Sequence, residues 1–172
     1  MNPRVNVLIL NWNGEKVINN CVDSVLTSDY NNYVITIIDN GSTDNSIDSF
    51  KGRKNIKIIQ IKTNLGYAKG YNYAFKKLKN NNDNYYLILN NDTLIEASTI
   101  TKFVEKAIKN GSNNIFGPRI INLKNRKNWF CGGKISKFSG QTSHIGLNSR
   151  NDYVSIKSSV VDYISGCCMF LN

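Results

Sequence analysis

Residues 5–14 read VNVLILNWNG, an almost unbroken aliphatic run that ends in polar residues and a glycine. An apolar run without alternating polar residues is typical of a strand that is covered on both faces. The segment that follows, 14–28, spaces its apolar residues so that they form one face of a helix. The chain therefore opens with a predicted buried strand followed by a helix.

This strand–helix pattern recurs along the first 111 residues. Further strands are predicted from their β-branched or apolar character, and helices from their periodic apolar faces. Ser98 is a candidate N-cap, and Gly111 stands where a glycine would end the last helix. The predicted elements lie at 33–39, 46–51, 56–61, 67–79, 85–89 and 98–109. Such alternation predicts an α/β fold with a mixed, mainly parallel sheet flanked by helices.

Beyond residue 111 the pattern loosens into short β-like pieces, NIFGPRII, NWFCGGKI and SSVVDYISGCCMFLN. We predict that they extend the same sheet in mixed orientation. No linker or internal repeat divides the chain, so 1–172 is interpreted as a single domain. The last piece reads as a buried strand with nothing after it to cover it, and an uncovered strand could recruit a second copy to form a homo-oligomer.

The composition excludes several kinds of site. The four cysteines form no C-x-x-C pair and His144 is the only histidine, which argues against zinc and disulfide frameworks. His144 itself is interpreted as a surface loop residue. No signal peptide or membrane-spanning run is recognised, and a reducing cytoplasm is the simplest expected location.

The formal net charge of +10 invites a nucleic-acid or membrane-surface interpretation. The basic residues form only short clusters, at 51–57 and 76–79, and such clusters are usually solvated. We therefore expect no nucleic-acid partner. Weak peripheral attraction to anionic lipid, at the inner face of the membrane, stays open.

Polar residues gather where the predicted strands end. The carboxyl ends of parallel strands meet at one edge of a sheet, where ligands bind. The residues placed there are Asn11, Trp12, Asn13, Asp39, Asn40, Gly41, Ser42, Thr63, Asn64, Gly66, Asn90, Asn91 and Asp92.

Two aspartates at this edge have two interpretations each. Asp39 stands where a carboxylate can accept hydrogen bonds from a ribose or a base, but it could equally cap the following turn. Asp92 can bind Mg²⁺ or Mn²⁺ on a nucleotide diphosphate, which needs only one or two protein carboxylates, or it can belong to a simple turn. Asp44 is interpreted as a helix cap or first-turn residue. Dinucleotide and P-loop motifs are absent from the sequence.

Six ordered segments together resemble the family 2 glycosyltransferases of the GT-A fold, close to their rhamnosyltransferase-like members. The matching segments cover nearly the whole chain, and in combination they favour the ligand-binding interpretation of the two aspartates. They are VNVLILNWNG at 5–14, ITIIDNGSTDNS at 35–46, NLGYAKGYNYAF at 64–75, YYLILNNDT at 85–93, FGPRI at 116–120 and VDYISGCCMFL at 161–171.

The resemblance implies that residues 1–111 bind a nucleotide sugar and that 112–172 begin an acceptor-binding part. The strand-one motif and Asp39 would line the base and ribose, and the NLG segment would border the diphosphate and sugar. The implied donor-binding residues are Asn11, Trp12, Asn13, Asp39, Asn40, Ser42, Asn64, Gly66, Asn72, Asn90 and Asn91. The family's D-x-D motif falls on 90–92, where its first acid is an amide, so Asp92 would carry the metal.

The implied reaction moves a sugar from a UDP- or dTDP-linked donor to an acceptor hydroxyl with inversion, in polysaccharide or glycolipid assembly. The acceptor would be a glycan or a lipid-linked molecule, and Asp162 lies in the acceptor-side motif. The resemblance places the general base in an acidic motif downstream of Asn172, so we expect a fragment that binds donor without efficient turnover. Two rivals are a sugar-phosphate nucleotidyltransferase, which would need a glycine-rich basic loop after strand one, and a non-catalytic polyanion-binding module.

Overall fold

The computed structural model describes residues 2–78, 84–111, 114–149 and 158–172. The chain alternates strands and helices up to α3 and then forms short strands. The elements are β1 Val5–Asn11, α1 Ile18–Leu26, β2 Tyr33–Asn40, the 3₁₀ helix η1 Asp48–Phe50, β3 Ile56–Ile61, α2 Tyr67–Leu78, β4 Tyr85–Asn90, α3 Thr99–Asn110, β5 Ile120–Ile121, β6 Asn128–Phe130, β7 Gly133–Ile135, β8 Thr142–His144 and β9 Cys168–Leu171.

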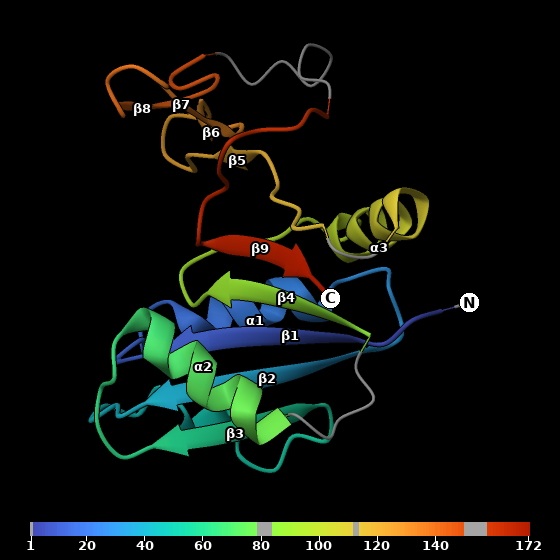
Figure 1. Ribbon diagram of the computed structural model, residues 1–172. Coiled ribbons are helices and arrows are strands. Elements are labelled where there is room, and N and C mark those ends of the chain that lie inside the picture. Colours follow the sequence, from blue (N-terminus) through green and yellow to red (C-terminus); the bar gives the residue numbers. More distant parts are fainter. Residues whose placement is uncertain (1, 79–83, 112–113, 150–157) are drawn as a thin grey trace.

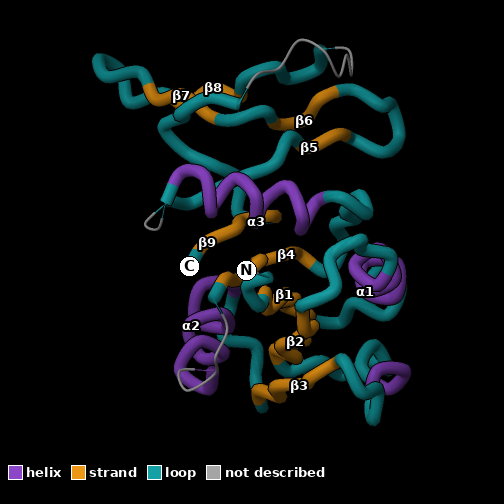
Figure 2. The backbone as a smooth tube through the Cα atoms, turned by 90° about the vertical axis from the view of Figure 1, so that its right-hand side faces the viewer, coloured by secondary structure: helices purple, strands orange, loops and turns teal. Residues whose placement is uncertain are grey.

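Five strands form the main sheet in the order β3-β2-β1-β4-β9 (Figure 1). The first four are parallel to one another, and β9 pairs with β4 in the antiparallel sense. The predicted α/β class and the mixed, mainly parallel sheet are therefore confirmed. Figure 2 shows the sheet end on, with α1 and α2 on opposite sides of it.

Two apolar layers enclose the sheet, as the aliphatic character of its strands predicts. On one face, Val5, Val7 and Ile9 of β1 pack with residues of α1 and α3. On the other face, Leu8 of the same strand packs with residues of α2. Alternate residues of β1 thus enter different cores, because successive side chains of a strand point to opposite faces.

Several predicted boundaries shift by a few residues. The helix predicted from residue 14 begins at Ile18, because 14–17 form a turn in which the Gly14 carbonyl accepts the N–H groups of Val17 and Ile18. The helix predicted near 46–51 is a single 3₁₀ turn. Ser98 does occupy the N-cap of α3, without a side-chain capping hydrogen bond. Residue 79, the predicted end of α2, lies outside the described residues.

The prediction for 112–172 is wrong in one respect. Among the described residues of this part, β9 is the only strand of the main sheet, and Phe116 adds a single bridge to it; β5 pairs with β6 and β7 pairs with β8 in two separate ribbons. These strands are two or three residues long, too short to continue the ladder of the main sheet. We call residues 117–149, which contain both ribbons, the outer lobe. In Figure 1 it lies beyond β9, on the side away from β3.

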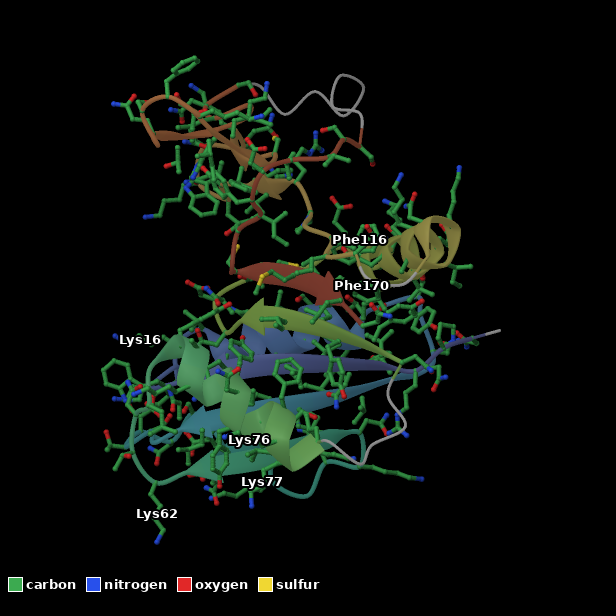
Figure 3. The ribbon with its side chains drawn as sticks, viewed as in Figure 1. Lys16, Lys62, Lys76, Lys77, Phe116 and Phe170 are labelled. Carbon is green, nitrogen blue, oxygen red and sulfur yellow. The ribbon has the colours of Figure 1, made fainter. Side chains whose placement is uncertain are left out.

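The last strand is better covered than the sequence suggests. Phe170 of β9 is fully buried and stacks on Phe103 of α3 and on Tyr85, with ring centroids 5.1 Å apart in both pairs. Its backbone also exchanges two hydrogen bonds with Phe116, of 2.8 and 2.9 Å, and Figure 3 shows the two residues side by side. The outer edge of β9 is thus partly paired within the chain, which weakens the argument for pairing with a second copy. No helix in the described ranges is long and apolar enough to cross a membrane.

Candidate functional site

The register of the sheet brings the predicted strand ends together. Asn11 lies beside Asp39 across the β1–β2 pair, and Leu10 lies beside Asn90 across the β1–β4 pair. The next residue of β2, Asn40, pairs with Ile61 at the end of β3. The polar residues that follow these strands therefore share one edge of the sheet, as the parallel arrangement predicts.

Asn11 is the centre of this edge. Its side chain is fully buried and lies between the β2 loop and the β4 turn. The amide nitrogen donates to the hydroxyls of Ser42, at 3.2 Å, and Ser46, at 2.8 Å, and the amide oxygen accepts from Asn91 Nδ2 at 2.9 Å. Because these bonds use both amide protons and the oxygen, Asn11 positions its neighbours instead of presenting an open group to a ligand.

Gly14 makes room for this buried amide network. A Cβ atom at residue 14 would lie 2.2 Å from Asn11 Oδ1 and 2.4 Å from Asn91 Nδ2. Such distances are far inside van der Waals contact, so any side chain here would displace the amides. The glycine that ends the opening sequence stretch is therefore required by the close approach of two asparagines.

The loop after β2 is locked to the loop after β1. Asn13, which has a left-handed backbone with φ 51°, accepts the Thr43 N–H on its Oδ1 at 2.8 Å. Its own N–H donates to Ser42 Oγ at 3.0 Å. Asparagine tolerates this backbone conformation better than most residues. The two loops therefore form one rigid surface, from which the side chain of Trp12 stands 55% exposed.

Asp44 supports the same loop, but it does not cap the following helix as predicted, because η1 begins only at Asp48 with Ile47 at its N-cap. Its carboxylate accepts hydrogen bonds from Ser46 Oγ and from the backbone N–H groups of Ser46 and Glu15. Burial raises the pKa of Asp44, but the hydrogen bonds from Ser46 and Glu15 outweigh it and hold the pKa below its ordinary value. The carboxylate thus stays ionised as a structural acceptor.

Asp39 borders an open pocket of ≈ 420 Å³ beside the ends of β2 and β3. Its Oδ1 accepts the Ser42 N–H at 3.1 Å, so the carboxylate both holds the turn and reaches the pocket wall. The turn-holding interpretation of this residue is therefore confirmed, and its binding to a ribose or a base stays a prediction. Gln60 and Lys62 also line the pocket, and sequence reasoning missed them. The signal was their place at the end of β3, where Gln60 pairs with Asp39.

A second depression, of ≈ 400 Å³, lies along β3 over Phe50, Ile56 and Ile58. It extends along β3 from Ile56 to Gln60, and none of the residues that line it is acidic. We place the site at the pocket beside Asp39, because of these two only that pocket is lined by Asp39 and by residues of the loop after β2.

Asn40 ties the β2 end to the segment before α2. Its Nδ2 donates to Asn64 Oδ1 at 2.9 Å, and its Oδ1 accepts the Leu65 N–H at 3.0 Å. Asn64 Oδ1 also accepts the Gly66 N–H at 2.8 Å. Asn40, Asn64 and Gly66, which were predicted to bind the nucleotide sugar, are therefore in contact with one another. Asn72 is exposed on α2 and stands apart from this network.

The turn after β4 leaves one carboxylate exposed. Asn91 is held by Asn11, and the Thr93 N–H donates to the Asn90 carbonyl at 3.2 Å. The Asp92 side chain is exposed at this turn. Burial raises the pKa of the nearby Cys21 thiol to about 12, and the negative charge of Asp92 adds to the effect. Among the described residues, no three His, Cys, Asp or Glu side chains cluster as a metal site.

Two residues predicted from sequence lie elsewhere. Asp162 Oδ2 accepts the Ile135 N–H of β7 at 2.8 Å and so belongs with the outer lobe. His144 is exposed, as predicted, but it lies in strand β8 and not in a loop, and its ring packs edge-on against Phe130 at 5.0 Å. One link to the strand ends was not foreseen, since the hydroxyl of Tyr67 in α2 donates to the carbonyl of Gly166.

Comparison with known proteins identifies related chains. An uncharacterised glycosyltransferase of Haemophilus influenzae is 31% identical over 112 residues, which are 63% of this chain and 34% of that protein. A teichoic acid poly(glycerol phosphate) polymerase of Staphylococcus epidermidis is 25% identical over 67% of this chain and 16% of its own. Glycosyltransferase GlyG of Streptococcus pneumoniae is 24% identical over 68% of this chain and 39% of its own. The chain thus spans well under half of these relatives.

Solved structures share the fold. The Staphylococcus aureus TarS fragment in complex with UDP-GlcNAc superposes with a TM-score of 0.62 at 21% identity, covering 72% of this chain and 36% of that chain. Mannosyltransferase PcManGT of Pyrobaculum calidifontis, in complex with GDP-Man and Mn²⁺, gives a TM-score of 0.61 at 17% identity, over 73% of this chain and 37% of its own. Both are GT-A enzymes, and at this identity the likeness concerns the fold. The model of the family described as "Glycosyl transferase family 2" matches residues 6–172, and the chain therefore belongs to that family.

Proposed function

We propose that the protein transfers a sugar, of hexosyl or rhamnosyl type, from a UDP- or dTDP-linked donor to an acceptor hydroxyl with inversion. We place this reaction in polysaccharide or glycolipid assembly, with a glycan or lipid-linked acceptor at the cytoplasmic side of a membrane. One observation carries the proposal, namely the buried Asn11 amide that ties the β2 loop and the β4 turn into one surface. The structural neighbours bound to UDP-GlcNAc and GDP-Man support a nucleotide-sugar donor.

The pocket beside Asp39 is the proposed place of the nucleoside. A carboxylate oxygen that reaches the pocket can accept a hydrogen bond from a base imide or a ribose hydroxyl. Gln60 offers an amide and Lys62 a cation on the same wall. The diphosphate would then extend from this pocket along the sheet edge toward Asp92 in the turn after β4.

Asp92 fits a divalent ion in one specific way. With one exposed carboxylate and no cluster of three metal-binding side chains in the described ranges, the protein alone is a weak Mg²⁺ or Mn²⁺ site. Ions of this kind take most of their ligands from phosphate oxygens and water, so a single aspartate suffices when a diphosphate is present. When bound, such an ion would neutralise the charge that grows on the leaving diphosphate.

In the proposed reaction, the acceptor oxygen forms a bond to the anomeric carbon while the bond from that carbon to the diphosphate oxygen breaks. The acceptor proton passes to a general base. We assign Asp39 to orienting the nucleoside and Asp92 to holding the diphosphate through the ion. We assign neither residue to the base, because both lie on the donor side of the sheet edge.

Isothermal titration calorimetry with UDP, dTDP, GDP and ADP, each with and without Mn²⁺, tests the proposal. We expect saturable binding of UDP or dTDP that Mn²⁺ strengthens and that Asp39→Ala weakens. Asp23→Ala, on the exposed side of α1, is the matched control and should bind as the unaltered chain does. Absence of binding by all four nucleotides would contradict the proposal, and preference for GDP would change the assigned donor class.

A further inference from the structure

The outer lobe combines two surface properties that a protein rarely shows to water together. It contains six lysine or arginine residues and no aspartate or glutamate, whereas the chain as a whole has 22 basic and 12 acidic residues. It also exposes large apolar side chains, which soluble surfaces seldom gather in one place. These apolar side chains are Leu123, Trp129, Ile135, Phe138 and Leu147.

Phe138 is the extreme case, because it is fully exposed at the tip of the β7–β8 hairpin. The turn that presents it is well ordered by hydrogen bonds. The Ser136 N–H donates to the Gln141 carbonyl at 2.8 Å, and the Gly140 N–H donates to the Ser136 carbonyl at 2.9 Å. Gly140 has φ +69°, which a side chain would disfavour. The tip is thus a built structure that holds an aromatic ring in solvent.

Cations flank the ring on the same hairpin. Lys137 precedes Phe138 in the turn, and Lys134 lies on β7; both side chains are exposed. The nearest acidic residue along the lobe's paired strands is Asp162, whose carboxylate is already bonded to the Ile135 N–H. The positive charge around the tip is therefore not neutralised by an ion pair within the described part of the hairpin.

An aromatic cluster fixes the base of the hairpin. His144 of β8 packs against Trp129 and Phe130 with ring centroids 5.7 and 5.0 Å apart, and Tyr163 lies 5.9 Å from Phe130. Trp129 is 41% exposed, so one side of this cluster still faces solvent. Tryptophan at such a position is typical of side chains that settle at the boundary of headgroups and acyl chains.

We propose that the outer lobe docks on an anionic lipid bilayer, with Phe138 inserted among the headgroups and Lys134 and Lys137 facing lipid phosphates. Charge complementarity selects the partner, since anionic lipid attracts a surface on which six basic residues stand beside one carboxylate, that of Asp162. The exposed ring distinguishes a bilayer from nucleic acid, because a ring at a hairpin tip gains from penetrating an apolar layer. The β7–β8 hairpin is then the part of the molecule through which the net charge of +10 acts on anionic lipid.

The geometry is compatible with donor binding at the sheet edge. The outer lobe lies beyond β9, and the pocket beside Asp39 lies by β2 and β3 at the opposite side of the sheet (Figure 1). A bilayer against the hairpin tip would therefore leave that pocket open. The docking inference is independent of the identity of the donor.

Vesicle sedimentation with the full chain tests the proposal. Vesicles of phosphatidylglycerol with phosphatidylcholine should bind the protein, vesicles of phosphatidylcholine alone should not, and added salt should weaken binding. Each cation removed should lower partitioning about fivefold, so Lys134→Gln with Lys137→Gln should lower it about 25-fold. Phe138→Ser should lower it about tenfold, because the inserted ring is lost.

The matched control is Lys76→Gln with Lys77→Gln, an exposed pair in the last turn of α2 that removes the same charge (Figure 3). It should lower partitioning less than about twofold, because these lysines lie away from the docked surface. If the control variant bound vesicles as weakly as the Lys134 and Lys137 variant does, the proposal would be overturned, since net charge alone would then explain binding. Circular dichroism on every variant confirms that the fold is kept.

Fluorescence gives a second reading. In a Trp12→Phe background, the emission of Trp129 should shift to shorter wavelength with anionic vesicles and stay unchanged with neutral ones. Equal binding to neutral vesicles, or preferential binding to a DNA oligonucleotide, would overturn the proposal. A third outcome would also overturn it: the protein does not bind vesicles but forms a concentration-dependent dimer, and Phe138→Ser abolishes that dimer. The surface would then be covered by a second copy.

Discussion

The main sheet and the outer lobe differ in how far they bury their apolar side chains. In the sheet, strands of six to eight residues, β1 to β4, bury their apolar faces under α1, α2 and α3. In the outer lobe, strands of two or three residues pair in ribbons, and several large apolar side chains stay in solvent. The difference teaches that long repeated strands bury nearly all of their apolar side chains, whereas short ribbons bury a few, such as Phe130, and leave others available for contact with a partner.

Two phenylalanines give the sharpest comparison of the regions. Phe170→Ala should lower the free energy of unfolding by about 3–5 kcal/mol, because a fully buried ring stacked on Phe103 and Tyr85 is removed. Phe138→Ala should change it by less than about 0.5 kcal/mol, because that ring touches solvent. Urea denaturation of both variants measures the two values. Similar losses would show that the hairpin tip is packed in solution.

Two buried asparagines of β1 separate stability from ligand binding. Asn11→Ala should cost about 2–3 kcal/mol of unfolding free energy, because it leaves the Ser42, Ser46 and Asn91 groups without their buried partner. It should also weaken nucleotide binding roughly tenfold, since the two loops lose their common support. Denaturation and calorimetry give the two numbers.

The control is Asn6→Ala on the same strand. Asn6 is equally buried, and its Oδ1 accepts the Thr36 hydroxyl at 2.8 Å, but it lies away from the strand ends. We expect it to lower stability by a similar amount and to leave nucleotide affinity unchanged after correction for the folded fraction. If both variants lose affinity alike, Asn11 has no special role in positioning the site.

The regular part of the chain was the part that the sequence predicts well. The strand at Ile56–Ile61 and the strand beginning at Val5 were placed to the residue, because their apolar residues are mostly β-branched or aliphatic and are typical of strands in a sheet. Gln60 and Lys62 were missed, because their place on the pocket wall depends on which strand lies beside β2. The role of Asn11 as a support was missed too, since burial of a polar side chain is not visible in a sequence.

The outer lobe was predicted poorly for a physical reason. Its ribbons depend on turn hydrogen bonds and on contacts such as that of Phe130 with His144, which join residues from separate strands. Periodicity cannot reveal such contacts in segments of three residues. The same shortness explains why these strands do not extend the main sheet.

Two aspartates, Asp92 at the edge of the main sheet and Asp162 bonded to the outer lobe, test the assignment of the metal ligand. Asp92→Asn should reduce the Mn²⁺-dependent gain in nucleotide affinity by about tenfold, because the one protein ligand in a shell of phosphate oxygens and water is lost. Asp162→Asn should leave that gain unchanged, since its side chain lies against β7 and an amide oxygen can still accept the Ile135 N–H. Calorimetry with and without Mn²⁺ measures both. Equal gains in the Asp92 variant and the unaltered chain would remove Asp92 as a ligand.

The smallest expected effect compares two cysteines at high pH. Burial raises the pKa of Cys168, in the core beside β4, well above its ordinary value of 9.0, and raises that of Cys131 in the outer lobe as well. The folded state therefore keeps a proton on Cys168 that the unfolded chain releases above pH 9.0, so its contribution is complete below that pH and is lost as pH rises further. Near pH 10, Cys168→Ala should lessen the pH-dependent loss of unfolding free energy by about 1 kcal/mol. Cys131→Ala should lessen it less, because that thiol is only partly buried. Urea denaturation at a series of pH values measures how the free energy of unfolding changes with pH in each variant. Equal pH dependence in the two variants would mean that the Cys168 thiol is no better shielded from water than the Cys131 thiol.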